Sequence, residues 1–162
     1  MNSGRWDYIT NLVGVEYMSR EYPEMPIAGV VAIVFKEDSV LLVRRGNEPG
    51  RGRWGFPGGV VELGETVREA VVREAMEESG LHVEPTELVA VYDSLTQDDE
   101  GRIRFHYVLS EFLCRVVGGS LKPSSDVSDA RWFRLDELDT IDISKRTARF
   151  LRRLSTRIRI SD

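Results

Sequence analysis

Three glutamates within the segment GGVVELGETVREAVVREAMEESGL, residues 58–81, have the type and spacing that could do chemistry. Glu74, Glu77 and Glu78 fall on one side of a helix, where like charges one turn apart repel by about 0.2–0.5 kcal/mol per pair. A hard divalent cation would reverse that cost, because carboxylate oxygens are its preferred ligands. A solvated, charged helix face is the more usual explanation of such residues. The spacing of the three glutamates therefore makes a metal site possible without requiring one.

The neighbouring residues predict the helix that must position these carboxylates. Thr66 and Glu69 fit a capping box at its start, and Gly80 fits a left-handed residue that ends it. At about 100° per residue, the glutamates lie away from the apolar face. The residues expected on that apolar face are Val71, Val72, Ala75 and Met76.

A longer pattern, G-x5-E-x7-R-E-U-x-E-E-x-G-U, is matched at every fixed position. The matching residues are Gly59, Glu65, Arg73, Glu74, Ala75, Glu77, Glu78, Gly80 and Leu81. Such a match arises by chance on the order of once in a million chains of this composition. The segment resembles the Nudix box. LLVRR, WGFPGG and ARWF also resemble the segments that flank the box in Nudix domains, so the similarity runs over about residues 26–154.

The resemblance implies an α/β/α sandwich, with a mixed sheet between helices, that hydrolyses a nucleoside diphosphate linked to another group. It implies Mg²⁺, with Mn²⁺ as a substitute, bound by Glu74, Glu77, Glu78 and the Gly59 carbonyl. Glu65 and Arg73 would pair and hold the loop against the helix. The family varies in its catalytic base. Glu74 is the first choice here, and an acid from a later loop, above all Asp126, is the rival.

The remaining candidate site residues are those that could contact substrate. Arg44, Arg45 and Arg53 lie near the box, and guanidinium groups suit phosphate or ribose contacts. Solvent-facing positions at a strand end explain the same arginines equally well. Asp126 is a candidate for the substrate site as well as for the base. Three aromatic residues could stack on a base or belong to the core. They are Trp54, Phe56 and Tyr92.

Broader similarity favours one substrate. PIAGVVAIVF, LLVRRGNEPGRGRWGFPGG and HYVLSEFLC look most like the bacterial and archaeal ADP-ribose pyrophosphatases, which implies cleavage of ADP-ribose to AMP and ribose 5-phosphate. Hydrolysis of a nucleoside triphosphate such as 8-oxo-dGTP is the first alternative. A Nudix module that senses a nucleotide without cleaving it is the second. No box glutamate is missing, which favours an enzyme.

The rest of the chain reads as one mixed α/β domain, residues 26–162, preceded by an extension, residues 1–25. Two β-rich runs around KEDS predict a hairpin, three later runs predict strands, and DISKRTARFLRRL predicts a terminal helix. The extension places apolar residues at helical spacing, which indicates a packing or dimer element. These residues are Trp6, Ile9, Val13 and Tyr17.

Composition excludes several other classes of protein. The chain has 162 residues, 41% of them hydrophobic, and a net charge of −5, which argues against general nucleic-acid binding. The sequence lacks a run long enough to span a bilayer and any signal-peptide pattern, so we expect a cytoplasmic protein. Cys114 sits in an apolar run and is expected to be buried. A homodimer is the arrangement that related domains imply.

Overall fold

The computed structural model of the protein describes residues 20–123 and 127–161. The apolar stripe that the sequence predicts before residue 20, and Asp126, lie outside the described residues. Two helices and seven strands are assigned within them. In chain order these are β1 (Ile27–Lys36), β2 (Ser39–Arg45), β3 (Trp54–Gly55), β4 (Gly58–Val60), α1 (Val67–Ser79), β5 (Leu81–Gln97), β6 (Ile103–Gly119), β7 (Val127–Arg134) and α2 (Lys145–Ser161).

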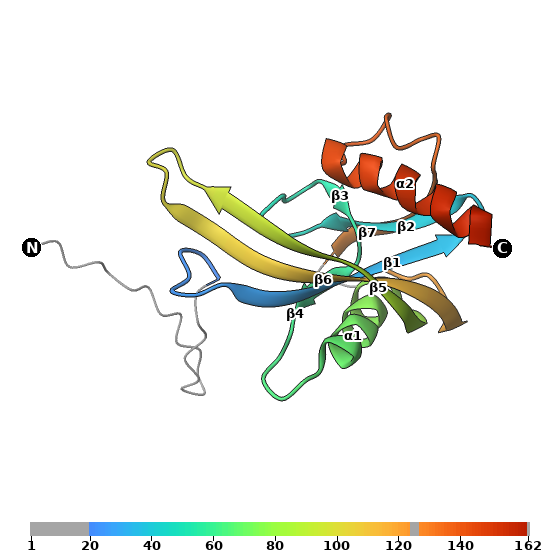
Figure 1. The fold of residues 1–162 in the computed structure, drawn as a ribbon, viewed down its shortest axis with the longest axis horizontal. Coiled ribbons are helices and arrows are strands. Elements are labelled where there is room, and N and C mark those ends of the chain that lie inside the picture. The colour runs from blue at the N-terminus through green and yellow to red at the C-terminus, as the bar shows by residue number, and fades with distance from the viewer. Residues whose placement is uncertain (1–19, 124–126, 162) are drawn as a thin grey trace, which may run out of the picture.

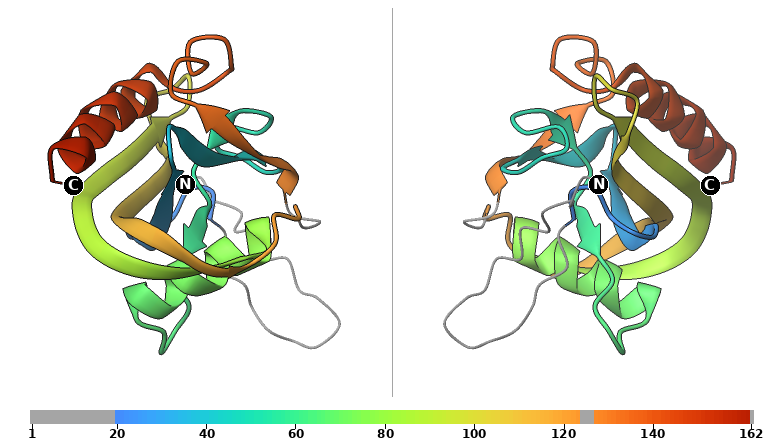
Figure 2. Two further views of the ribbon diagram at one scale, coloured as in Figure 1. Left: turned by 90° about the vertical axis from the view of Figure 1, so that its right-hand side faces the viewer. Right: turned by 90° about the vertical axis from the view of Figure 1, so that its left-hand side faces the viewer.

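The strands form a mixed sheet in the order β3-β2-β1-β6-β5. β1 runs parallel to β6 and antiparallel to β4, whereas β2 runs antiparallel to β1, β3 and β7. β5 and β6 form a long antiparallel hairpin whose register shifts at several points. Figure 2 shows these two long strands curving around the centre of the molecule. β1 pairs with β2, β4 and β6 and is therefore the central strand of the sheet.

Helices cover both faces of the sheet, with α1 on one side and α2 on the other (Figure 1). Alternate residues of β1 face alternate sides, as the period of a strand requires. Val30, Ala32 and Val34 pack with Ala70, Val71 and Ala75 of α1. The intervening residues Val31 and Ile33 pack with α2, which contributes Ala148, Leu151 and Leu154. This arrangement confirms the expected α/β/α sandwich with a mixed sheet.

Several local predictions are confirmed. The hairpin turns at KEDS, where Glu37 adopts a positive φ of 53°. Ala148, Leu151 and Leu154 form the buried side of the terminal helix. Cys114 is buried in the α1-side core, and burial raises the pKa of its thiol to about 12, so it serves packing.

One prediction about α1 is wrong. Met76 is 41% exposed, and Ala70 takes its expected place on the apolar face. The sheet lies under Ala70, Val71 and Ala75, which fill the interface and leave Met76 at its edge. In the part of the chain that the structure describes, no helix is long and apolar enough to cross a membrane.

Candidate active site

A short unit of strand, loop and helix builds the site. Gly58–Val60 forms β4 against β1, the chain turns through residues 61–66, and α1 then begins. Thr66 caps α1 with the full capping box that the sequence predicts, since its side chain accepts from the Glu69 amide and Glu69 accepts from the Thr66 amide. At the other end, Gly80 has φ 73° and donates its N–H to the Met76 carbonyl. Local sequence therefore fixes both ends of the helix that carries the glutamates.

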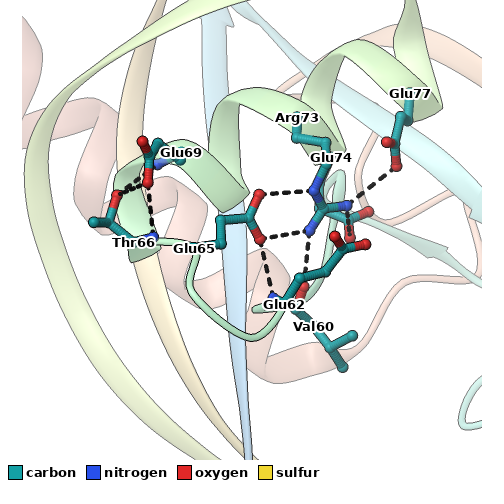
Figure 3. A network of polar contacts seen from close by, with 8 residues as sticks. All are labelled: Val60, Glu62, Glu65, Thr66, Glu69, Arg73, Glu74 and Glu77. Carbon is teal, nitrogen blue, oxygen red and sulfur yellow. Dashed lines mark hydrogen bonds and ion pairs between the residues drawn. The ribbon is translucent and has the colours of Figure 1, made fainter. Parts of the chain in front are cut away.

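Arg73 ties this helix to the preceding loop (Figure 3). Its Nε and Nη2 donate to the two oxygens of Glu65 at 2.8 and 2.9 Å, and Nη2 also donates to the Val60 carbonyl at 3.0 Å. Nη1 donates to Glu74 at 2.7 Å and to Glu77 at 3.2 Å. These hydrogen bonds, together with one from the Glu62 amide, lower the pKa of Glu65 to about 2. One guanidinium thus offsets part of the repulsion among the carboxylates that the sequence places together.

The Glu74 carboxylate packs directly against Gly59. Its side chain is only 13% exposed, and a Cβ placed on Gly59 would lie 2.5 Å from the Glu74 carboxyl carbon. Any larger residue at 59 would therefore displace the Glu74 carboxylate from this position. Burial raises the pKa of Glu74, while Arg73 opposes that shift. The other two helix glutamates have different surroundings. Glu78 accepts a hydrogen bond from the Gly58 amide at 2.9 Å, and the Glu77 side chain is 54% exposed.

These carboxylates form one wall of a cleft of about 440 Å³. Glu62, Glu74, Glu77 and Glu78 supply acidic groups, and Arg20 and Arg45 supply basic ones. Phe56, Tyr107 and Leu109 contribute apolar surface, and Ser94 contributes a hydroxyl. A wider groove, of about 730 Å³, lies along α2 and shares no residue with this cleft. The charged residues that line it are basic apart from Asp139, so this groove lacks the several carboxylates that a cation site needs.

The cleft suits a hard divalent cation on the chemistry of its donors. Glu74, Glu77, Glu78 and the backbone of Gly59 all line it, and oxygen ligands of this kind match Mg²⁺ or Mn²⁺. Among the described residues, no three acidic, histidine or cysteine side chains are already gathered around one point. Arg73 and the Gly58 amide instead hold the carboxylates. All three carboxylates project from one face of the helix, which is the arrangement that a shared ion would need.

The structure separates the arginines that the sequence grouped together. Arg45 lines the cleft. Arg44, its neighbour, points elsewhere and donates to the Gly52 carbonyl at 2.9 Å, and Arg53 pairs with Asp142 at 3.1 Å. The aromatic candidates divide in the same way, since only Phe56 lines the cleft. Trp54 packs edge-on against a core phenylalanine, and Tyr92 lies beneath Arg146.

Sequence reasoning missed several residues of the cleft, among them Arg20 and Tyr107. Arg20 belongs to the extension, which the sequence predicts to be a packing element, yet it lines the cleft. Tyr107 lies on β6 directly opposite Ser94 of β5. Burial raises the pKa of the Tyr107 phenol, whereas Arg20 and Arg45 act to lower it. Nothing local in the sequence marks either residue, because each reaches the cleft through pairing with a distant segment.

The fold and the cleft define a class of α/β protein built to hold a cation beside an anionic ligand. Residues 25–154 match the NUDIX domain model, and the chain belongs to the Nudix hydrolase family. It is 42% identical over 113 residues to the ADP-ribose pyrophosphatase of Methanocaldococcus jannaschii, an alignment that covers 70% of this chain and 64% of that protein. The chain thus spans less than two thirds of that relative.

A second relative and a solved structure are also similar to this chain. The chain is 38% identical over 117 residues to the 8-oxo-dGDP phosphatase NUDT18 of Homo sapiens, covering 68% of this chain and 33% of that protein. Among solved structures, it is similar to the MutT NUDIX hydrolase from Burkholderia pseudomallei. That similarity has a TM-score of 0.63 with 31% identity, and it covers 75% of this chain and 89% of that chain.

Proposed function

We propose that the protein is a divalent-metal-dependent pyrophosphohydrolase that cleaves ADP-ribose to AMP and ribose 5-phosphate. The observation that carries this proposal is the cleft, which box carboxylates and Arg45 line together in a chain that matches the family. A diphosphate carries negative charge that repels an attacking water. The Mg²⁺ or Mn²⁺ ion, when bound, would neutralise that charge and lower the pKa of water.

The protein groups have separate tasks in this proposal. Glu74, Glu77, Glu78 and the Gly59 carbonyl would hold the metal. Glu65 and Arg73 position Glu74, because the guanidinium bonds both carboxylates and the Val60 carbonyl at once. We also propose Glu74 as the general base, because its carboxylate lines the cleft and would lie beside water on the metal. Asp126, the rival base, lies outside the described residues.

Two observations support ADP-ribose over the alternatives. The archaeal relative at 42% identity is an ADP-ribose pyrophosphatase. The basic side of the cleft also offers more than one guanidinium, which suits a group with two phosphates. The similarity to the 8-oxo-dGDP phosphatase makes an oxidised guanine nucleotide the second candidate. A non-catalytic sensor is the least favoured, because every box carboxylate is present.

A product analysis tests the proposal. The purified chain is incubated with ADP-ribose, 8-oxo-dGDP or 8-oxo-dGTP in turn, with Mg²⁺, Mn²⁺ or a chelator, and the products are separated by chromatography. We expect AMP and ribose 5-phosphate from ADP-ribose, and no turnover with chelator. Intact ADP-ribose beside efficient cleavage of an 8-oxo nucleotide would overturn the substrate. Binding without cleavage of any nucleotide would favour the sensor.

We also propose that the extension, residues 1–25, packs against the domain or a second copy, and that the protein is a cytoplasmic homodimer. Light scattering on the full chain and on a chain that lacks residues 1–19 tests the dimer. We expect twice the monomer mass for the full chain. A monomer in both cases would refute the homodimer.

A further inference from the structure

The chain that enters β1 is fastened to the far end of the β5–β6 hairpin. The Tyr22 amide donates to the Arg104 carbonyl at 2.8 Å, and Glu21 forms an ion pair with Arg104. The Tyr22 hydroxyl donates to Asp98 at 3.0 Å, across 76 residues of sequence. Arg102 lies over the Tyr22 ring, 5.1 Å from its centroid. These contacts hold residues 20–22 against the hairpin tip, and we call them the Tyr22 latch.

The acceptor of this latch is also held by its own loop. Asp98 accepts from the backbone amides of Glu100 and Arg102 and from the Arg102 side chain at 2.8 Å. Although burial opposes the shift, these hydrogen bonds lower the pKa of Asp98 to about 2. Tyr22 itself adopts a positive φ of 54°, which is uncommon for a residue with a side chain. Asp98 is held in place by its loop, and Tyr22 reaches it in an uncommon backbone conformation. Both features indicate that contact with the hairpin tip defines the path of the chain just before β1.

The path of the chain before β1 determines where Arg20 lies. It lines the cleft beside Arg45 and acts electrostatically on both Glu74 and Tyr107. No hydrogen bond or ion pair joins the Arg20 or Arg45 side chain to any other residue that the structure describes. The Arg45 side chain passes Gly50 with its Cδ and Gly55 with its Cδ and Nη1. Arg20 and Arg45 both act to lower the pKa of Tyr107, so two guanidiniums lie near one phenol in the cleft that the box carboxylates also line.

We propose that Arg20 binds a phosphate group of the substrate together with Arg45, and that the Tyr22 latch positions it. This inference rests on the proposed function, because it assumes a ligand with phosphate groups. The box carboxylates and their metal would take one side of a diphosphate, and the two guanidiniums would take the other. Arg20 lies before residue 25, where the match to the family model begins, so this contact is an addition made by the extension.

Calorimetry with inorganic pyrophosphate and Mg²⁺ tests the contact without requiring turnover. Arg20→Ala should weaken pyrophosphate binding about tenfold to a hundredfold, which is the range for loss of a hydrogen bond between charged groups. Arg20→Lys should recover part of the loss, because charge remains but the planar fork does not. Arg149→Ala is the matched control, since Arg149 lines the separate α2 groove. Equal affinity in Arg20→Ala and Arg149→Ala would overturn the proposal, as would failure of the unaltered chain to bind pyrophosphate.

Kinetics then separate binding from chemistry. With whichever nucleotide the chain hydrolyses, Arg20→Ala should raise KM by a similar factor and leave kcat within about twofold. A loss confined to kcat would refute a binding role. Calorimetry uses pyrophosphate and Mg²⁺ without a nucleotide, so its result does not depend on whether ADP-ribose is the substrate. Failure of the Arg20 proposal and failure of the proposed substrate are therefore distinguishable.

The latch is tested by a double-mutant cycle. Asp98→Asn weakens the acceptor for Tyr22 with little change in shape, so it should raise KM in the parent chain. In a chain that already carries Arg20→Ala, the same change should have no further effect, because the residue being positioned is gone. Additive effects of the two changes would show that Asp98 acts independently of Arg20. A fall in melting temperature without any change in KM would reduce the latch to a structural contact.

Discussion

Replacing Gly59 by alanine should remove activity while leaving the fold intact. A Cβ at this position would lie 2.5 Å from the carboxyl carbon of Glu74 and 2.7 Å from its Oε2. Ordinary van der Waals contact begins at about 3.4 Å. The Glu74 carboxylate would therefore have to withdraw by about 0.9 Å. It can do so, because it is the far end of a flexible side chain.

That displacement sets the size of the expected effect. A misplacement of about 1 Å in a catalytic group can reduce turnover about a hundredfold, equivalent to about 2.7 kcal/mol in the activation barrier. The stability cost should stay at the lower end of the about 1–3 kcal/mol seen for overpacked sites. We therefore expect Gly59→Ala to lower kcat about a hundredfold with a small change in melting temperature.

Two other glycines provide matched controls. A Cβ on Gly118 would meet only the His82 side chain at 3.8 Å, an ordinary contact, so Gly118→Ala should behave like the parent. A Cβ on Gly58 would lie 3.0 Å from the Val31 Cα and closer still to the Val30 carbonyl oxygen. Backbone of the central strand cannot yield, so Gly58→Ala should destabilise the fold itself.

The assay compares kcat and melting temperature for the three alanine variants at saturating Mg²⁺. Gly59→Ala should lose turnover, Gly58→Ala should lose stability, and Gly118→Ala should lose neither. If Gly59→Ala turns over at the parental rate, then either Glu74 does not occupy this position or its position does not matter to the reaction. Either explanation would refute the predicted link between the position of Glu74 and turnover.

Three further changes follow from the site and the core. Glu74→Gln should lower kcat at least a hundredfold, and because it weakens the bond to Arg73 it should not raise the melting temperature; near-parental turnover would remove Glu74 from the mechanism. Arg73→Ala should lower both kcat and stability, the latter by about 1–3 kcal/mol, since it strands Glu65 and the Val60 carbonyl; thermal unfolding measures this. Burial outweighs Arg146 and raises the pKa of Glu111 above the ordinary value of 4.5, and its Oε2 has no hydrogen-bond partner among the residues that the structure describes. The folded state therefore favours the protonated form, so stability from this group is present below about pH 4.5 and is lost as pH rises through the raised pKa. Glu111→Gln should match the parent near pH 4 and exceed it by about 1–3 kcal/mol at pH 7 in denaturant unfolding, and an equal difference at both pH values would contradict this.

The sequence by itself determined the parts of this protein that depend on local chemistry. The capping box at Thr66 and the left-handed Gly80 lie within one turn of the helix ends they fix. The period of apolar residues set the strands around KEDS and the buried face of the terminal helix. Hydrogen bonds and periodicity over a few residues are sufficient for these features. The pairing of Glu65 with Arg73 is instead implied by the resemblance to the Nudix box, and the structure has it.

The tertiary structure alone decided which side chains share the cleft. Arg44 and Arg45 are adjacent in sequence, and alternation along a strand sends them to opposite sides. Only the tertiary structure decides that Arg45 lines the cleft while Arg44 donates to the Gly52 carbonyl. Arg20 also lines the cleft, and Tyr22, two residues later, bonds a residue 76 positions away. The partner of Glu111 is likewise found 35 residues further along the chain, on α2. A local pattern carries no record of such contacts, because they depend on the register and curvature of strands that meet only when the whole sheet has formed.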